Sequence, residues 1–477
     1  MGLPKLLSLL LLILLHAQSS QPFQPIRQLT LPAIRPLPQP TFQALKSNSN
    51  SNSNSNGNEP LDTIDVNNNW LAFAPIFISS HWNESPVLLK NSFRESPDDP
   101  VIAGSSSWPT KEDVYDLAAD EDCEVRMITH DPSEDHWALE LGPFAPEELR
   151  PPPTIPHSLV VNDVDRFLPH VADWMDANFN FFPNWRRDDG QISLAGEDGG
   201  IGFHVDSYDV FLVQVSGERN WTVELDFLSE NEEIDRLDSR HDVRILRPPN
   251  SPKRTVSVTL KPGDMLYLPP RIPHCGTATT PDCMTLSVGF RSPSASEMLS
   301  SLAEEIGERV RSGSSSDERY SESNPDDLLE NASRGLLTRS SSEVCKRILL
   351  DAINGVEWDE WFGKHVTESK RFRMDYPQPA GEEQGLWGDP EAAVSSILDA
   401  GRGMLFQAEG LTFAYNEKGD LFIDGNHFPG ISTRVSRIIC DNRCLTQSHF
   451  EHLLPDLPRA LLKDLVSRGF LYGCDGP

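Results

Sequence analysis

Two histidines and one aspartate have the residue types of a metal site. His204 and Asp206 lie two residues apart in an apolar stretch that predicts a strand over residues 204–215. Because side chains alternate across a strand, positions i and i+2 face the same way and could bind one ion. His274 follows a second predicted strand, residues 265–268, and a proline-rich loop. Two histidines and one carboxylate on one face of an octahedral ion are typical of non-haem iron(II) oxygenases, although an isolated His-x-Asp pair also occurs by chance.

Arg219 gives a second, independent indication. Strand alternation puts Arg219 on the same side as Trp221 and Val223, which predicts an inward-facing guanidinium. A buried guanidinium is costly unless an anion meets it, and arginine binds carboxylates in a bidentate manner. Beside an iron site, the expected anion is the distal carboxylate of the co-substrate 2-oxoglutarate, with dioxygen as the second co-substrate. The alternative is an internal ion pair with a protein acid, Asp209 or Glu224.

The elements that must position these side chains are short and rich in apolar residues. Strands are predicted at residues 191–195, 204–215, 218–225, 256–260, 265–268 and 284–291, separated by turn signals such as Pro262-Gly263-Asp264. This pattern predicts a mainly β fold with some α, a double-stranded β-helix like the jelly roll of cupins. Upstream, strands are expected at residues 87–90, 125–129 and 137–141, and a helix over residues 164–175.

Helical spacing replaces the strand pattern after residue 292. Helices are predicted at residues 298–310, 326–337, 344–353 and 358–370. A further unit begins after Pro377-Gln378-Pro379, with helices at 390–400, 433–441 and 453–467 and strands at 403–408, 411–416 and 421–424, which suggests a winged helix. We therefore expect a presequence and Ser-Asn spacer at 1–58, a catalytic domain at 59–295, a helical region at 296–376 and a winged-helix-like domain at 377–477.

The charge balance limits the classes of partner. The formal net charge is −31, from 41 Lys+Arg against 72 Asp+Glu. Binding to nucleic acid needs a basic surface, so direct DNA binding is not expected. A basic protein partner would be attracted, although acidic residues also serve solubility alone. The seven cysteines contain no CxxC pair, so neither a zinc site nor a disulfide framework is predicted.

The N-terminal segment has the composition of a targeting signal. A short apolar run up to Leu15 follows Lys5, and no Asp or Glu occurs before Glu59. The run is too short to span a bilayer and is typical of a secretory signal, and the acid-poor sequence after it is typical of a transit peptide. Together they indicate a bipartite presequence for a plastid, with the mitochondrion and the secretory pathway as alternatives. No membrane span is expected in the mature protein.

Several motifs resemble the JmjC ribosomal oxygenases of the cupin superfamily. The resemblance rests on residues 185–193, 199–211, 261–270, 273–274 and 287–291, and extends upstream to 81–90 and downstream to 361–363. Within that family it points to the bacterial-type arginine hydroxylases of large-subunit ribosomal protein sixteen. The resemblance implies a JmjC jelly roll, a helical dimerisation region that forms a homodimer, and a C-terminal winged helix. It also implies 2-oxoglutarate-dependent hydroxylation of an arginine β-carbon.

The resemblance also assigns roles to individual residues. It makes His204, Asp206 and His274 the iron(II) ligands, Arg219 and Ser193 the 2-oxoglutarate-binding residues, and Asp189 and Tyr208 the residues that hold the substrate arginine. A carboxylate pairs with a guanidinium and an aromatic face stacks on it, so the last two residue types fit that role. Alternatively, Asp189 caps a turn and Tyr208 is an ordinary barrel residue.

The chain departs from the family pattern beside the site. Gln191 stands where the family usually has methionine, Phe203 replaces a proline, Cys275 replaces an acid, and Glu218 and Asn220 replace basic residues. These changes leave the iron chemistry intact but bear on substrate choice. Two other functions therefore stay open: a JmjC hydroxylase or demethylase of another protein, including histones, and a non-catalytic cupin binding protein.

Overall fold

The computed structural model describes most of the chain beyond residue 60. The described residues are 61–93, 108–150, 152–247, 254–322, 326, 335–369, 390–399, 403–450 and 459–475. They divide into two compact units. One contains residues 59–294 and 357–477, and residues 295–356 belong to the other.

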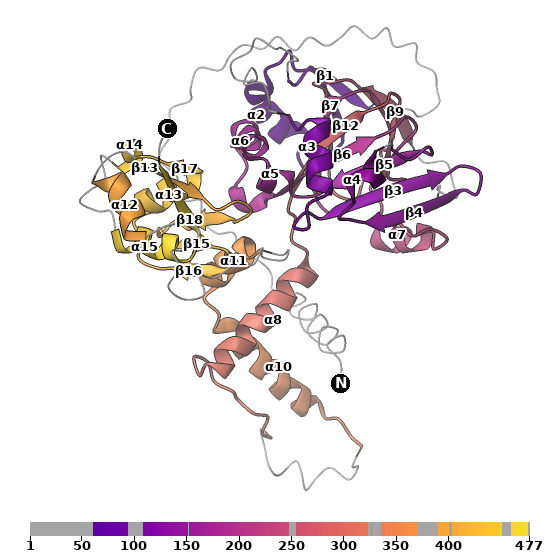
Figure 1. The fold of residues 1–477 in the computed structure, drawn as a ribbon. Coiled ribbons are helices and arrows are strands. Elements are labelled where there is room, and N and C mark those ends of the chain that lie inside the picture. Colours follow the sequence, from indigo (N-terminus) through magenta and orange to yellow (C-terminus); the bar gives the residue numbers. More distant parts are fainter. Residues whose placement is uncertain are drawn as a thin grey trace. The chain divides into compact units, whose positions relative to one another are not determined.

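A large antiparallel sheet is the frame of the first unit (Figure 1). Its nine strands run in the order β1-β2-β10-β7-β12-β6-β5-β3-β4, and only β1 and β2 pair in parallel. These strands are β1 (Asp62–Asp65), β2 (Val87–Lys90), β3 (Val125–Asp131), β4 (His136–Leu141), β5 (His157–Val161), β6 (Arg187–Ala195), β7 (Asp209–Ser216), β10 (Met265–Leu268) and β12 (Cys283–Phe290).

A smaller sheet of three strands packs on the inner face of this frame. Its order is β11-β8-β9, formed by β8 (Arg219–Glu224), β9 (Thr255–Leu260) and β11 (His274–Ala278). Leu212 of β7 and Trp221 and Val223 of β8 belong to one buried apolar cluster between the sheets. Each such side chain contributes about 1.5–3 kcal/mol by leaving water. The predicted double-stranded β-helix is therefore confirmed, and its inner face lies between the two sheets.

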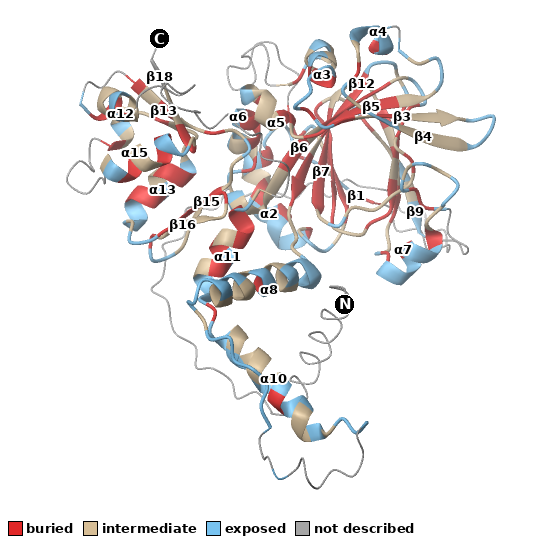
Figure 2. Ribbon diagram, turned by 60° about the horizontal axis from the view of Figure 1, so that its bottom comes forward, coloured by how far each residue is buried: buried red, intermediate tan, exposed pale blue. Residues whose placement is uncertain are grey.

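The outer face of the large sheet is covered by helices. Ile192, Phe211 and Leu286 belong to the core under these helices. Figure 2 shows β6 and β7 as largely buried strands, with the partly exposed helices α2, α5 and α6 beside them. The helices are α2 (Trp70–Ser80), α3 (Lys111–Ala118), α4 (Pro146–Leu149), α5 (Val164–Phe167) and α6 (Pro169–Asn178). The single helix predicted over residues 164–175 is wrong in one respect, because it is broken at Leu168, whose backbone is extended. Pro169 disfavours a helical conformation in the residue before it.

The C-terminal part of the same unit has its own apolar core around Leu405, Leu421 and Leu462. It contains two three-stranded sheets, β17-β13-β18 and β14-β15-β16. Its elements are α11 (Trp358–Thr367), α12 (Pro390–Leu398), β13 (Gly403–Gln407), β14 (Phe413–Tyr415), β15 (Leu421–Ile423), β16 (Asn426–Phe428), α13 (Thr433–Asp441), β17 (Cys444–Leu445), α14 (Gln447–Phe450), α15 (Arg459–Ser467) and β18 (Leu471–Asp475). The predicted helices and central strands are present, and the winged helix stays a prediction.

The second unit contains two amphipathic helices, α8 (Ala295–Arg311) and α10 (Arg339–Asn354). In each helix one residue is buried, Leu302 and Val344 respectively. Dimerisation through this region stays a prediction, and most of the helix expected at 326–337 lies outside the described residues. In the part of the chain that the structure describes, no helix is both long and apolar enough to cross a membrane.

Candidate metal centre

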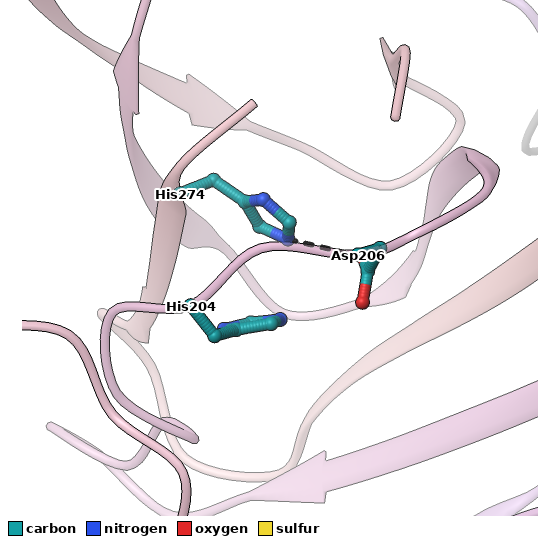
Figure 3. A group of neighbouring side chains, drawn as sticks. All are labelled: His204, Asp206 and His274. Atoms are coloured by element: carbon teal, nitrogen blue, oxygen red, sulfur yellow. Dashed lines mark ion pairs between the residues drawn. The ribbon is translucent and has the colours of Figure 1, made fainter. Parts of the chain in front are cut away.

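The three residues predicted to bind a metal converge on the inner face of the jelly roll (Figure 3). One ligand atom from each of His204, Asp206 and His274 lies within 4.8 Å of the other two. The Nε2 atom of His274 is 3.5 Å from Oδ2 of Asp206, and the two imidazole rings are 4.3 Å apart between centroids. This is the only cluster of His, Cys, Asp and Glu in the described residues that could hold an ion.

The His-x-Asp segment is held differently from our expectation. The strand predicted over residues 204–215 starts only at Asp209, so His204 and Asp206 are not alternate residues of one strand. Instead, His204 and His274 form an isolated antiparallel bridge, with N–H···O distances of 3.0 and 2.9 Å. The carbonyl of Asp206 accepts a hydrogen bond from the Arg271 N–H at 2.8 Å. The segment therefore takes its shape from backbone bonds to the segment that carries the third residue.

Each histidine is oriented by a backbone carbonyl. Nδ1 of His204 donates to the Gly202 carbonyl at 3.0 Å, and Nδ1 of His274 donates to the Ile272 carbonyl at 2.9 Å. This fixes the tautomer that leaves both Nε2 atoms free of protons and able to bind a cation. Burial and the neighbouring His204 lower the pKa of His274 to about 4, against the opposing effect of Asp206. His274 is therefore neutral near pH 7, as a metal ligand must be.

The loop before His274 is braced by helix α7 (Glu230–Arg236). Arg271 has a left-handed backbone, with φ of 68°, which is unfavourable for a residue with a side chain. Its side chain donates to the Leu228 carbonyl at 2.6 Å and pairs with Glu233 at 2.8 Å. These contacts stabilise a loop conformation that sequence patterns did not reveal, and they hold the backbone that bonds to Asp206.

Arg219 lies on the same face of the small sheet as His274. In the β8–β11 register, His274 faces Val223 and Arg219 faces Ala278, so all four side chains point the same way. The Trp221 ring lies between them, 5.7 Å from the His274 ring and 5.8 Å from the guanidinium carbon of Arg219. Four positions along β8 separate Arg219 from Val223, the residue opposite His274, and at about 3.3 Å per residue this is a span of roughly 13 Å.

The guanidinium of Arg219 is buried and has no acidic partner in the part of the chain that the structure describes. Arg219 is 2% exposed, and its one hydrogen bond runs from Nη1 to Oγ of Ser193 at 3.1 Å. Its Nε and Nη2 atoms are buried and have no partner among the described residues. A buried guanidinium in this state favours an anion.

The two acids considered as partners of Arg219 in the sequence pair with other groups. Glu224 makes a bidentate ion pair with Arg236 at 2.8 and 2.9 Å. Asp209 accepts hydrogen bonds from Tyr267 at 2.6 Å and from Arg186 at 3.1 Å. The internal ion pair that we considered for Arg219 is therefore not formed.

The two predicted substrate-binding residues also lie near the inner face. Asp189 precedes Ser193 by four residues on β6 and is 6% exposed, so both side chains face inward. Tyr208 is half-buried, and its ring lies within 3.3 Å of the position that a Cβ atom would take at Gly289. The structure thus brings both residues to the inner sheet.

The other histidines of the described residues are not part of the cluster. His241 lies in a polar stretch of sequence, yet its side chain is only 6% exposed and its Nδ1 accepts a hydrogen bond from the Trp137 N–H at 3.3 Å. The polar residues next to His241 in the sequence gave no indication that its side chain is buried. His130 stacks on Trp137 with 4.2 Å between centroids.

Comparison with known proteins places this geometry in a family. The JmjC domain model matches residues 175–298, which include every residue of the cluster. The ribosomal protein uL16 3-hydroxylase of Escherichia coli is 28% identical over 408 residues, which are 85% of this chain and 97% of that protein. A probable ribosomal oxygenase of Haemophilus influenzae is 28% identical over 349 residues, 72% of this chain and 78% of that protein.

Solved structures agree. The X-ray structure of E. coli YcfD has a TM-score of 0.68 and 27% identity, and the match covers 84% of this chain and 98% of YcfD. YcfD, a ribosomal oxygenase, in complex with cobalt and 2-oxoglutarate gives a TM-score of 0.66 with 26% identity over the same shares of both chains. The chain therefore contains a JmjC domain and is similar over most of its length to ribosomal oxygenases.

Proposed function

We propose that this oxygenase is an iron(II)- and 2-oxoglutarate-dependent protein hydroxylase that modifies the β-carbon of an arginine in large-subunit ribosomal protein uL16. The observation that carries the proposal is the cluster of His204, Asp206 and His274 beside a buried Arg219 that pairs with no described acid. Two binding requirements, one for a cation and one for an anion, thus occur on one face of the jelly roll.

The metal part follows from the donor set. Two neutral imidazoles and one carboxylate suit iron(II) and leave coordination positions open for a co-substrate. When bound there, iron(II) with 2-oxoglutarate activates dioxygen for hydroxylation. The structure of the E. coli relative in complex with cobalt and 2-oxoglutarate supports a metal ion and 2-oxoglutarate as the bound groups.

The protein contributes binding and orientation. Arg219 and Ser193 would hold the distal carboxylate of 2-oxoglutarate, since two guanidinium donors and one hydroxyl group meet at that position. The apolar cluster around Trp221 and Val223 excludes water from the same space. A dry, preorganised site strengthens each of these charged contacts.

The substrate assignment rests on chemistry and on the relatives. Asp189 supplies a buried carboxylate for a guanidinium, and Tyr208 supplies an aromatic face beside it. The formal charge of −31 suits a basic ribosomal protein as partner. Two relatives are named for uL16 3-hydroxylation and as a ribosomal oxygenase. We further propose that the modification takes place in an organelle, a plastid according to the presequence composition.

Mass spectrometry tests this proposal directly. The purified protein is incubated with iron(II), 2-oxoglutarate and peptides of uL16 from the organelle and from the cytosol. We expect a gain of one oxygen on an arginine and stoichiometric succinate with wild-type protein, and neither with His204→Ala. Succinate formation coupled to oxidation of a histone peptide would instead identify a different JmjC substrate. A protein that binds neither iron(II) nor 2-oxoglutarate would be a non-catalytic cupin.

A further inference from the structure

Gln191 lies at the centre of the proposed active site. It stands on β6 between Asp189 and Ser193, and alternation points all three side chains to the inner face. The intervening residues Ile192 and Leu194 belong to the core on the other side of the sheet. Gln191 is half-buried on a strand whose next four residues are all buried. Its side chain is therefore partly accessible, on the strand between the residues proposed for co-substrate and for substrate.

The amide of Gln191 is anchored by a chain of polar side chains that leads to the surface. Its Nε2 atom donates to Oδ1 of Asn162 at 2.8 Å, and the same Oδ1 accepts from Nη2 of Arg126 at 3.0 Å. Nδ2 of Asn162 donates to Oε1 of Glu124 at 2.8 Å. Asn162 is 3% exposed, so these bonds form largely out of water.

The charged side chains at the end of this hydrogen-bonded series determine the direction of each hydrogen bond in it. A guanidinium only donates and an ionised carboxylate only accepts. Arg126 must therefore meet the oxygen of Asn162, and Glu124 must meet its nitrogen. Because the Asn162 oxygen is the atom that faces Gln191, Gln191 must present its nitrogen to it. Its own amide oxygen is then directed away from Asn162.

The amide oxygen of Gln191 is left as an acceptor. Among the described residues, the only side-chain hydrogen bond of Gln191 is the one to Asn162. We propose that Gln191 is a specificity-determining residue whose fixed amide oxygen, next to the Asp189 carboxylate, selects a substrate side chain with several N–H donors in one plane. This inference rests on the proposed function and deepens it, because a guanidinium spreads five N–H donors over a planar fork and reaches two separate acceptors, whereas the three donors of an ammonium all sit on one atom.

The fixed orientation is what makes the residue selective. A freely rotating glutamine could offer either its donor or its acceptor to a substrate, whereas the anchored amide offers only the acceptor. Methionine, the residue that the resembling family usually has here, offers a thioether that is a weak acceptor. Glutamine in place of methionine therefore adds a hydrogen-bond acceptor for the arginine side chain. The compact ammonium of lysine gains less binding energy from this acceptor.

Peptide binding to the loaded protein tests the proposal. Cobalt(II) replaces iron(II) to prevent turnover, 2-oxoglutarate is present, and calorimetry gives Kd for a uL16 peptide containing the target arginine and for the same peptide with lysine. A hydrogen bond to a charged donor is worth about 1.5–3 kcal/mol. Gln191→Met should therefore reduce the arginine-over-lysine preference at least about tenfold, with cobalt and 2-oxoglutarate affinities unchanged.

Two variants of Asn162 form a matched pair. Asn162→Asp combined with Glu124→Gln keeps an oxygen for the Gln191 nitrogen and gives the second oxygen an N–H donor, so this variant should retain the preference. Asn162→Leu releases the amide and should lower the preference severalfold. Thermal melting and cobalt binding verify that each variant is folded. A preference that is unchanged by Gln191→Met, or lowered equally by both Asn162 variants, would overturn this inference alone. A wild-type protein that does not prefer arginine would overturn the proposed substrate as well.

Discussion

Replacing Arg219 with methionine should weaken 2-oxoglutarate binding severely without destabilising the fold. In the structure the guanidinium makes one hydrogen bond, to Ser193, and buries Nε and Nη2 without partners among the described residues. A carboxylate that meets two of its donors gains two charged hydrogen bonds, each worth about 1.5–3 kcal/mol. Since about 1.4 kcal/mol is a factor of ten, Arg219→Met should raise Kd for 2-oxoglutarate roughly 10²- to 10⁴-fold.

The stability of the free protein should move in the opposite direction. A buried polar group without a partner costs about 1–3 kcal/mol, and methionine removes that cost while filling much of the same volume. We therefore expect Arg219→Met to unfold at an equal or higher urea concentration than the wild type. Such an outcome identifies a residue retained for function at the expense of stability.

Arg236 provides the matched control. It is also buried on the small-sheet side, but its guanidinium forms a bidentate pair with Glu224, whose side chain is 1% exposed. Removing one partner of a buried pair costs about 3–5 kcal/mol, because the other charge stays buried. Arg236→Met should therefore be destabilised by about that amount.

Urea unfolding followed by tryptophan fluorescence, and calorimetric titration of the cobalt-loaded protein with 2-oxoglutarate, measure both quantities. If Arg219→Met loses more than about 2 kcal/mol of stability, the guanidinium has a structural partner and the anion-site reasoning is refuted. The same holds if its affinity for 2-oxoglutarate matches that of the wild type.

Four further outcomes are expected. Asp206→Ala should abolish cobalt(II) binding, measured by calorimetry, and should leave the melting temperature unchanged. The reason is that the Asp206 side chain is 21% exposed and contributes little to the core. Loss of the folded state in this variant would assign Asp206 a structural role instead. Tyr267→Phe removes the 2.6 Å hydrogen bond to the buried carboxylate of Asp209 and should lower the free energy of unfolding in urea by about 1–3 kcal/mol. An unchanged urea midpoint would show that this hydrogen bond does not stabilise the fold. Burial raises the pKa of Asp165 above its ordinary value, so the folded state binds the proton more tightly and stability falls as the pH rises above that ordinary value. Asp165→Asn should flatten this slope in unfolding measured across mildly acidic pH, and an unaltered slope would exclude Asp165 as its source. Residues 1–58 fused to a fluorescent reporter should direct it to plastids, and secretion of the reporter would refute the targeting prediction.

Much of the active-site chemistry was predictable from local patterns. Strand alternation indicated that Arg219, Trp221 and Val223 share one face, and the structure buries all three against the large sheet. This worked because the side-chain period of a strand is fixed by backbone geometry and needs no knowledge of the partner strand. Very short strands such as β16 and β17 escaped prediction, since two or three residues carry too little periodicity.

The fold itself decided which distant groups meet. His204 and Asp206 share a site because the backbone of residues 204–206 bonds to residues 271–274, a pairing that an i, i+2 spacing does not encode. Glu224 satisfies Arg236 and so leaves Arg219 for an anion, a choice between equally plausible sequence partners.

The sequence by itself thus determined the residue types of the site: two histidines, an aspartate and an inward-facing arginine. The tertiary structure decided how they act. It brought the two histidines of the site into one backbone bridge and left Arg219 without an acid among the described residues. It also oriented the Gln191 amide through Asn162, a residue 29 positions away along the chain. The physical reason is that face and periodicity are local properties of the backbone, whereas the choice of hydrogen-bond and charge partners depends on which strands the fold places side by side.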